Sequence, residues 1–430
     1  MPKRVATFYL GSMNPAFFPS LPFALSYPLL FGVLLVAGML GGEAARAVHL
    51  PRILGYVIVG FVIAPLAAAL DLDPLVEQAR IFVDLALGLV LFDLGRRMHL
   101  QWLKRDWTLA ATALAENALT FGAVFATLIA FDFRAVNAAL CASIAMATSP
   151  AVLLLIVQDT RAEGQVTERA LNLVALNSLF ASILSTILLT SASLEARMDV
   201  DQALLLPLYL FAGSLLLGFA MAAFARVIAR SVEKTRDLHF TLIAGLVVAA
   251  VGLATLLKLS VILALLAFGL FSRNDARSHD LLNVNLAPSS RLLYIVLFVI
   301  TGASLPPSAL LTAGAAGLAL AAARLAGKFV AVLALAPFGG LRLRQAVGLG
   351  LSLAPVSTFA LLLQHDVARQ YPDFADVSTI FLAAIFVMEF IGPVAVQVGL
   401  KIAGETAPDD DVGSTTGRHV ARIPGAEGSR

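Results

Sequence analysis

Charged residues are scarce in this chain: only 13% of its 430 residues are Asp, Glu, Lys or Arg, whereas 59% are hydrophobic. Ordinary soluble domains carry roughly 25% charged residues, so this composition excludes a soluble globular protein. The net charge of +2 leaves no strongly basic surface, which argues against nucleic acid as a partner. The single cysteine, Cys141, lies inside an apolar run, so disulfides and cysteine-based metal sites are excluded as well.

Motifs of metal binding and hydrolytic catalysis are also missing. The six histidines show no paired spacing of the kind that binds metals. No serine stands in a Gly-x-Ser-x-Gly context, and no histidine accompanies a serine within an apolar run, which argues against an intramembrane hydrolase. We therefore expect no cofactor, no resident metal and no enzyme activity.

Long apolar windows take up almost the whole chain. Each is about 20 residues long, enough for a helix to cross a hydrocarbon core of roughly 30 Å. The thirteen windows are residues 21–42, 53–70, 80–96, 107–131, 135–158, 167–192, 203–230, 238–256, 258–273, 289–305, 308–336, 343–364 and 377–401. They predict an all-α, polytopic membrane protein with about thirteen transmembrane helices in a domain spanning residues 21–403. Residues 1–20 are an N-terminal segment, and the polar residues 404–430 are predicted to be a disordered cytoplasmic tail.

Basic residues gather in alternate loops between these windows. With the N-terminus placed outside, the inner loops hold seventeen Lys and Arg residues and the outer loops hold five. Because cytoplasmic loops of membrane proteins carry an excess of Lys and Arg, this asymmetry predicts an outer N-terminus and a cytoplasmic C-terminus. We interpret the chain as a multi-pass protein of a bacterial inner membrane.

Two of the windows are interrupted near their middle by a proline. Pro150 follows Thr148 and Ser149 midway along the fifth window, and Pro355 lies midway along the twelfth. A broken membrane helix leaves backbone groups unpaired in hydrocarbon, which is tolerated only where that backbone lines a cavity or binds a ligand. The two windows lie seven apart in order and therefore cross the membrane in opposite directions. This pattern is typical of the inverted repeats of secondary transporters, whose substrate site is formed by interrupted helices near the middle of the bilayer.

Polar side chains in six of the windows fall at a similar depth. They are Glu116, Thr148, Ser149, Asn177, Ser178, Arg324, Lys328, Ser357 and Glu389. An ionisable group in mid-membrane must be paired with an opposite charge, neutralised or hydrated, so Lys328 needs an anion nearby. A Lys that exchanges protons with a carboxylate could couple proton transfer to the transport of a solute. Arg324 and Lys328 share one helix face because they are four residues apart. The simpler reading is that the Ser and Thr hydroxyls bond their own backbone and that the charged groups form a structural ion pair.

Several stretches of this sequence resemble the monovalent cation:proton antiporters, the family of bacterial sodium/proton and potassium/proton exchangers. These stretches are HLPRILGYVIVGFVIAP (49–65), LALGLVLFDLGRRMHLQWL (85–103), residues 145–178 with the first break, residues 324–363 with Lys328 and the second break, and EFIGPVAVQVGL (389–400). The resemblance implies thirteen spans divided between a dimerisation domain and a mobile core domain, with alternating access by movement of the core. It also implies that the two broken helices, in the fifth and twelfth windows, cross each other in the core domain. It further implies a homodimer in a lipid bilayer that exchanges Na⁺ or K⁺ for H⁺.

This sequence departs from the family pattern at one position. The family usually carries an acidic pair, or an Asn-Asp or Gln-Asp pair, in the span after the first broken helix, and the second residue binds cation and protons in turn. Here Asn177 is followed by Ser178, so that carboxylate is missing. Lys328 matches the family's Lys but lacks its usual carboxylate partner.

Three interpretations of this departure remain open. In the first, Glu116 or Glu389 supplies the carboxylate from a neighbouring helix, which charge balance around Lys328 favours. In the second, coupling to protons is lost. In the third, the chain transports another solute, held by the neutral oxygen ligands Thr148, Ser149, Asn177 and Ser178. The leading prediction is a secondary antiporter of Na⁺ or K⁺ against protons, and the alternative is a proton-uncoupled transporter on the same fold.

Overall fold

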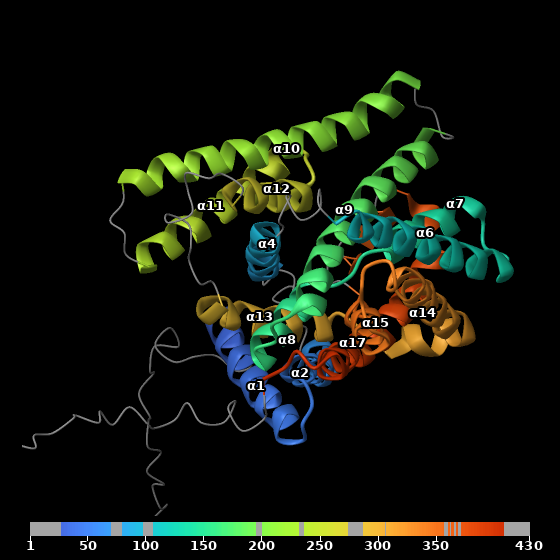
Figure 1. The fold of residues 1–430 in the computed structure, drawn as a ribbon, viewed down its shortest axis with the longest axis horizontal. Helices are drawn as coiled ribbons and strands as arrows, with labels where there is room; N and C mark the ends of the chain where they lie inside the picture. The colour runs from blue at the N-terminus through green and yellow to red at the C-terminus, as the bar shows by residue number, and fades with distance from the viewer. Residues whose placement is uncertain are drawn as a thin grey trace, which may run out of the picture.

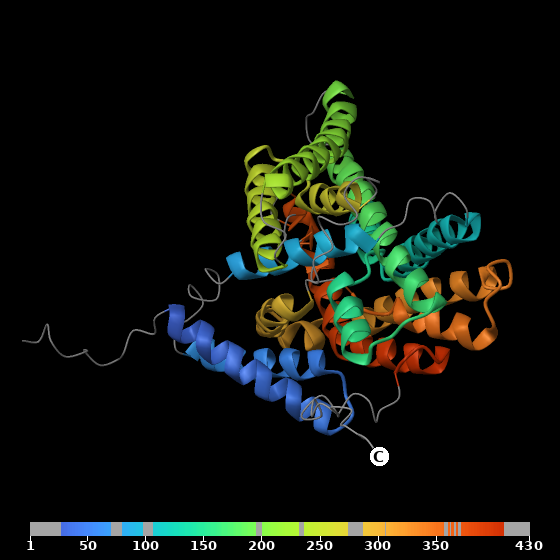
Figure 2. The ribbon, with the colours of Figure 1, turned by 60° about the vertical axis from the view of Figure 1, so that its left-hand side comes forward.

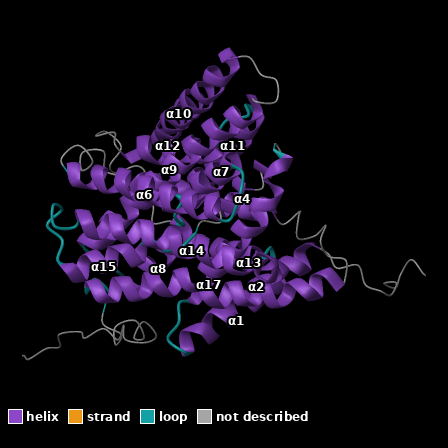
Figure 3. Ribbon diagram, turned by 90° about the vertical axis from the view of Figure 1, so that its right-hand side faces the viewer, coloured by secondary structure: helices purple, strands orange, loops and turns teal. Residues whose placement is uncertain are grey.

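The computed structural model describes residues 27–69, 80–97, 106–194, 200–231, 236–273, 287–305, 307–356, 360–361, 363–364, 367–368 and 371–407. Within these residues every regular element is a helix (Figure 3). The N-terminal segment 1–20 lies outside the described residues, as do residues 408–430 of the tail.

The helices follow the predicted apolar windows. They are α1 (Tyr27–Ala47), α2 (Arg52–Ala69), α4 (Arg80–Arg97), α6 (Trp107–Ala130), α7 (Ala135–Ala145), α8 (Pro150–Thr160), α9 (Gln165–Leu194), α10 (Val200–Ser231), α11 (Arg236–Leu256), α12 (Val261–Arg273), α13 (Ala287–Ala303), α14 (Pro307–Leu335), α15 (Leu343–Ser352), the short 3-10 helix η1 (Pro372–Phe374) and α17 (Ala375–Ala403). Each window overlaps at least one helix, so the all-α prediction is confirmed (Figure 1).

Seven apolar helices among the described residues are long enough to cross a membrane. They are Trp107–Ala130, Ala135–Thr160, Gln165–Leu189, Leu208–Ala229, Leu238–Leu256, Ala313–Leu335 and Val377–Ala403. Large apolar side chains stand exposed along the outside of α10, among them Leu208, Leu216, Phe219, Phe224 and Val227. An exposed apolar face of this extent suits lipid rather than water.

The helices pack in two groups. In the first, α14 packs against α6 and α17, α15 packs against α17, and α7 packs against α6 and α9. In the second, α10 packs against α12, α12 against α4, α13 against α2, and α2 against α1. Figures 1 and 2 show the first group on one side of the molecule, with the long α9 running between the two groups. Both interrupted windows belong to the first group, in which α8 contacts α17 and α9.

The end of α17 is tied to the start of α9 by a carboxylate. Glu405 accepts hydrogen bonds from the backbone N–H groups of Val166 and Thr167, each at 2.7 Å, and from the Thr167 hydroxyl at 2.8 Å. These N–H groups belong to the first turn of α9, where helical partners are missing and the helix dipole favours an anion. Gly164 makes room for this contact, because a Cβ there would overlap the Glu405 side chain.

Replacing Glu405 with Ala is expected to lower the free energy of unfolding by about 1–2 kcal/mol, since the first turn of α9 then loses its capping carboxylate. Thermal unfolding of the purified protein in detergent measures this change. Glu163→Ala is the matched control, because Glu163 is an exposed carboxylate on the same turn. Equal stability of the two variants would show that the contact contributes nothing.

Candidate functional site

The first break separates α7 from α8 at the residues that the sequence predicted. Helix α7 ends at Ala145, and α8 begins at Pro150, whose ring removes a backbone N–H donor and disfavours helix at the residue before it. Ser149 accordingly has extended backbone angles (φ −72°, ψ 109°), and its hydroxyl accepts a hydrogen bond from Val152 N at 3.4 Å. Ser149 is therefore the N-cap of α8.

The second break follows α15 and touches the first. Helix α15 ends at Ser352, and the chain then leaves helical geometry before Pro355. The Ser149 backbone N–H donates to the Pro355 carbonyl at 3.2 Å, so the two breaks meet directly. Gly392 on α17 lies against Pro355, where a Cβ would come within 2.8 Å of the Pro355 Cα. Ser357, predicted to belong to this site, lies outside the described residues.

Arg324 joins the two breaks through backbone carbonyls. Its Nε donates to Ala145 O at 2.8 Å, and Nη2 donates to Ala147 O at 2.7 Å on the first break. On the second break, Nη1 donates to Ala354 O at 2.5 Å and Nη2 to Pro355 O at 3.1 Å. The guanidinium is fully buried, and it lies at the C-terminal ends of α7 and α15, where the helix dipoles favour a cation.

Lys328 lies one turn beyond Arg324 and pairs with Glu116. Its ammonium donates to a carboxylate oxygen of Glu116 on α6 and to Met146 O at 3.0 Å on the first break. Both side chains of the ion pair are fully buried. Helices α6 and α14 come close enough for this contact because Gly327 packs against the backbone of Thr120, where a Cβ would lie 2.7 Å from the Thr120 Cα.

A chain of amides extends from the ion pair to the first break. Asn117, next to Glu116, donates to the Asn177 side-chain oxygen at 2.7 Å, and Asn177 donates to the Thr148 hydroxyl at 3.2 Å. Ser178 instead donates to Val174 O at 2.9 Å within its own helix. The structure thus links Thr148 and Asn177 to the surroundings of Glu116, while the hydroxyls of Ser149 and Ser178 serve their own helices.

Glu389 is buried on α17 without a partner in the described part of the chain. Neither of its carboxylate oxygens has a hydrogen-bond or ion-pair partner among the described residues. A buried carboxyl group in this state is stable only when it is neutral, because an unpaired buried charge is strongly disfavoured. Of the two carboxylates predicted as partners for Lys328, the structure therefore brings only Glu116 to it.

Two residues of this region were missed by the sequence prediction. Asn117 and Thr120 lie beside Glu116 on α6, one position and one turn away. Three buried oxygens on this stretch lack hydrogen-bond partners in the described residues, namely Glu116 Oε2, Asn117 Oδ1 and Thr120 Oγ1. The signal that points to them is a group of polar residues on an otherwise apolar span, with Glu116 and Thr120 at the i, i+4 spacing of one helix face.

The family model for the transmembrane region of sodium/hydrogen exchangers matches residues 31–400. This match covers both breaks, the buried ion pair and Arg324. The chain belongs to the sodium/hydrogen exchanger family.

Solved structures of exchangers share the fold. The sodium proton antiporter MjNhaP1 from Methanocaldococcus jannaschii at pH 8 is 17% identical in sequence and superposes with a TM-score of 0.67 over 88% of this chain and 99% of that chain. A second structure of MjNhaP1, from electron microscopy, is also 17% identical and gives 0.66 over 88% of this chain and 98% of that chain. A search of curated protein sequences found no match. The chain therefore shares its fold with a sodium proton antiporter of distant sequence.

Proposed function

We propose that this exchanger is a secondary active antiporter that moves Na⁺ or K⁺ against protons by alternating access, with Glu116 in place of the missing Asp. The observation that carries the proposal is the fully buried Glu116–Lys328 pair beside the first broken helix. Its geometry supports the first of the three interpretations of the Asn177-Ser178 sequence. Family membership supports cation and proton exchange as the activity.

The free oxygens around Glu116 suggest how a cation binds. Glu116 Oε2, Asn117 Oδ1 and Thr120 Oγ1 are buried and lack partners in the described part of the chain, and oxygen ligands of this kind suit an alkali cation. The Thr148 hydroxyl of the first break lies at the other end of the amide chain. We assign these groups to cation binding, with Asn177 as the residue that orients them.

The charge balance of the buried pair couples cation binding to proton release. When a cation binds the Glu116 carboxylate, the Lys328 ammonium loses its only carboxylate partner among the described residues. A buried ammonium without an anion is strongly disfavoured, so Lys328 releases its proton as the cation arrives. The charge of the site then stays the same in the two states, which corresponds to one proton released for each cation bound.

The proposal also covers the orientation of the protein in its membrane, its oligomeric state and the movement that gives alternating access. From the basic loops of the sequence we expect the N-terminus on the outer side of a bacterial inner membrane and the C-terminus on its cytoplasmic side. A homodimer is expected from the family resemblance. Movement of the helix group with the broken helices against the group of α1, α2, α4 and α10–α13 would supply alternating access.

The test uses purified protein in liposomes with an imposed pH gradient and an internal pH dye. Addition of Na⁺ or K⁺ outside is expected to collapse the gradient. Tracer cation flux without collapse of the gradient would instead support the alternative, a proton-uncoupled transporter on the same fold. Absence of both signals would reject transport by this site.

Ser178→Asp is expected to rescue the exchange that Glu116→Gln loses. The new carboxylate lies on α9 next to Asn177, whose side chain is connected to the residue beside Glu116. In the double variant we expect an exchange rate within about tenfold of the wild type, a loss of about 1.4 kcal/mol or less in transition-state stabilisation. Ser182→Asp, one turn further along the same helix, is the control that should not rescue. Equal rates in both double variants would argue against a relocated carboxylate.

A further inference from the structure

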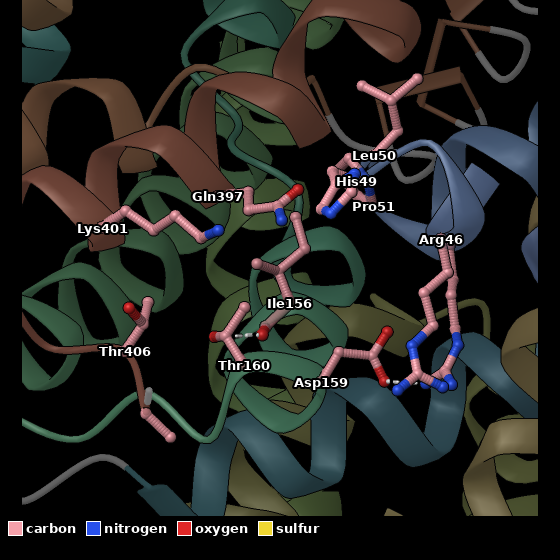
Figure 4. A pocket seen from close by; sticks show the side chains of 12 residues that line it. Arg46, His49, Leu50, Pro51, Ile156, Asp159, Thr160, Gln397, Lys401 and Thr406 are labelled. Atoms are coloured by element: carbon pink, nitrogen blue, oxygen red, sulfur yellow. Dashed lines mark hydrogen bonds and ion pairs between the residues drawn. The ribbon is translucent and has the colours of Figure 1, made fainter. Parts of the chain in front are cut away.

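A cavity of about 280 Å³ lies where α1 ends, α2 begins, and α8 and α17 end (Figure 4). Neither residue of the buried ion pair lines it, and it takes no part in the proposed exchange step. Its charged lining consists of Arg46, Arg52 and Lys401 with a single carboxylate, Asp159. The neutral side chains of Thr160 and Gln397 reach into the same space (Figure 4).

The positive charges of the cavity outnumber the negative ones. Arg52 contacts Asp159 at 3.2 Å and Glu43 at 3.0 Å, and Arg46 reaches the same Glu43 at 3.7 Å. Glu43 is half exposed and is shared between the two arginines. Three permanent cations therefore face two carboxylates, and His49 adds a further ring N–H donor to the lining.

Arg52 also has an unused donor. Its Nε is buried and has no hydrogen-bond partner among the described residues. A buried N–H without an acceptor is unfavourable, so an anion that accepts from it would be stabilised. Guanidinium groups suit phosphate oxygens in particular, because their N–H donors match them in pairs. A cation is the poorer fit, because the lining places three cationic side chains against a single carboxylate.

The size of the cavity limits the occupant. Its volume lies just below the range for drug-sized ligands, which is about 300–1,000 Å³. A single phosphate group with a short polar substituent fits such a volume better than a dinucleotide does. We propose that this cavity binds a phosphate-bearing anion, from an anionic lipid headgroup or a free phosphate compound, through Arg46, Arg52 and Lys401.

The cavity is lined by residues of both helix groups, so a bound anion affects the movement of one group against the other. Arg46 and Arg52 come from the helix group of α1 and α2, whereas Asp159 and Lys401 come from α8 and α17, which belong with the broken helices. An anion held from both sides ties the two groups together at the end of the molecule that carries the basic loops. Because the proposed exchange requires these groups to move against each other, bound anion slows exchange; this part rests on the proposed function.

Binding is tested first, without transport. Detergent-purified protein is titrated in a calorimeter with inorganic phosphate, glycerol 3-phosphate, short-chain phosphatidic acid and, as the neutral comparison, short-chain phosphatidylcholine. The Arg46→Gln/Lys401→Gln double variant is expected to bind the phosphate probe at least about tenfold more weakly, since it loses two charge-assisted contacts. Arg161→Gln, an exposed arginine one residue beyond Thr160 and outside the cavity lining, is the matched control and should bind as the wild type does.

Each outcome of the titrations either supports or overturns the proposed anion site. Binding of phosphatidic acid alone identifies a lipid headgroup, and binding of the soluble phosphates as well identifies a free phosphate compound. No saturable binding by the wild type, or equal weakening in the Arg161→Gln control, overturns the site. A thermal scan of each variant shows that it is folded, and the single variant Lys401→Gln replaces the double variant if the latter does not fold.

The tie between the two helix groups is tested in liposomes. Addition of the bound probe is expected to slow cation-dependent proton exchange severalfold in the wild type and to leave the double variant unaffected. Binding without slower exchange overturns the tie while leaving the site in place. If the wild type shows no exchange at all, the proposed function fails, and the calorimetric result still decides the site.

Discussion

Glu116→Gln is expected to abolish cation-dependent proton exchange and to destabilise the fold. The variant leaves the buried Lys328 ammonium without its carboxylate, and breaking one side of a buried ion pair typically costs about 3–5 kcal/mol. Exchange is lost because the amide cannot alternate between a cation and the ammonium. The measurements are dye-reported exchange in liposomes and thermal unfolding in detergent.

Glu389→Gln is the matched comparison for this prediction. It makes the same chemical change at an equally buried glutamate, but Glu389 has no partner to lose in the described structure. We expect its stability to equal or exceed that of the wild type and its exchange to persist. Loss of exchange in Glu389→Gln, with exchange retained in Glu116→Gln, would move the proton-carrying role to α17.

A double variant separates the structural role of the pair from its transport role. Glu116→Gln/Lys328→Gln removes both charges together, and two neutral amides leave no buried charge uncompensated. Its stability should recover most of what Glu116→Gln loses, whereas exchange should stay absent. If the double variant regained exchange, the pair would be a structural ion pair only.

Arg324→Leu is expected to cause the largest loss of stability in the chain. It would remove the guanidinium hydrogen bonds to four backbone carbonyls, two on each break, and only Pro355 O among them is known to keep a second donor, the Ser149 N–H. Each unsatisfied buried polar group costs about 1–3 kcal/mol, so we expect a loss of more than about 4 kcal/mol or failure to fold. The yield of monodisperse protein and its thermal unfolding temperature measure this effect.

Arg324→Lys should lie between Arg324→Leu and the wild type. A lysine keeps the charge at the two helix ends, but its single ammonium donates from one point and cannot reach carbonyls on both breaks. Arg344→Leu is the control, because Arg344 is exposed and makes one backbone contact, to Ile402 O at 3.1 Å. If Arg324→Leu were as stable as this control, the breaks would be held by other contacts.

Local features of the fold could be predicted because their causes are local. The apolar windows predict helices through their length, and Pro150 ends one helix and begins another whatever surrounds it. The shared face of Arg324 and Lys328 follows from their spacing of four residues, and in the structure both contact the end of α7. The stretches that resemble the exchanger family depend on order and spacing along the chain in the same way.

The choice between Glu116 and Glu389 depended on helix packing. Both lie at a similar depth in their spans, so sequence alone left two partners for Lys328. Tertiary structure decides because Gly327 allows α14 to approach α6, which brings Lys328 to Glu116, while Glu389 remains unpaired on α17. Asn117 and Thr120 belong to the site for the same reason, because they lie beside Glu116 on α6.

Composition and spacing were therefore enough to predict a helical membrane protein with two interrupted helices and with Arg324 and Lys328 on one helix face, and the family resemblance added exchange as the activity. Which side chains of distant segments meet in the cavity was settled by the packing of the helices. Arg52 and Asp159, 107 residues apart, meet in a cavity whose lining also includes Lys401. No periodicity in a single helix encodes such a meeting, because it arises only when the faces of several helices pack around a common space.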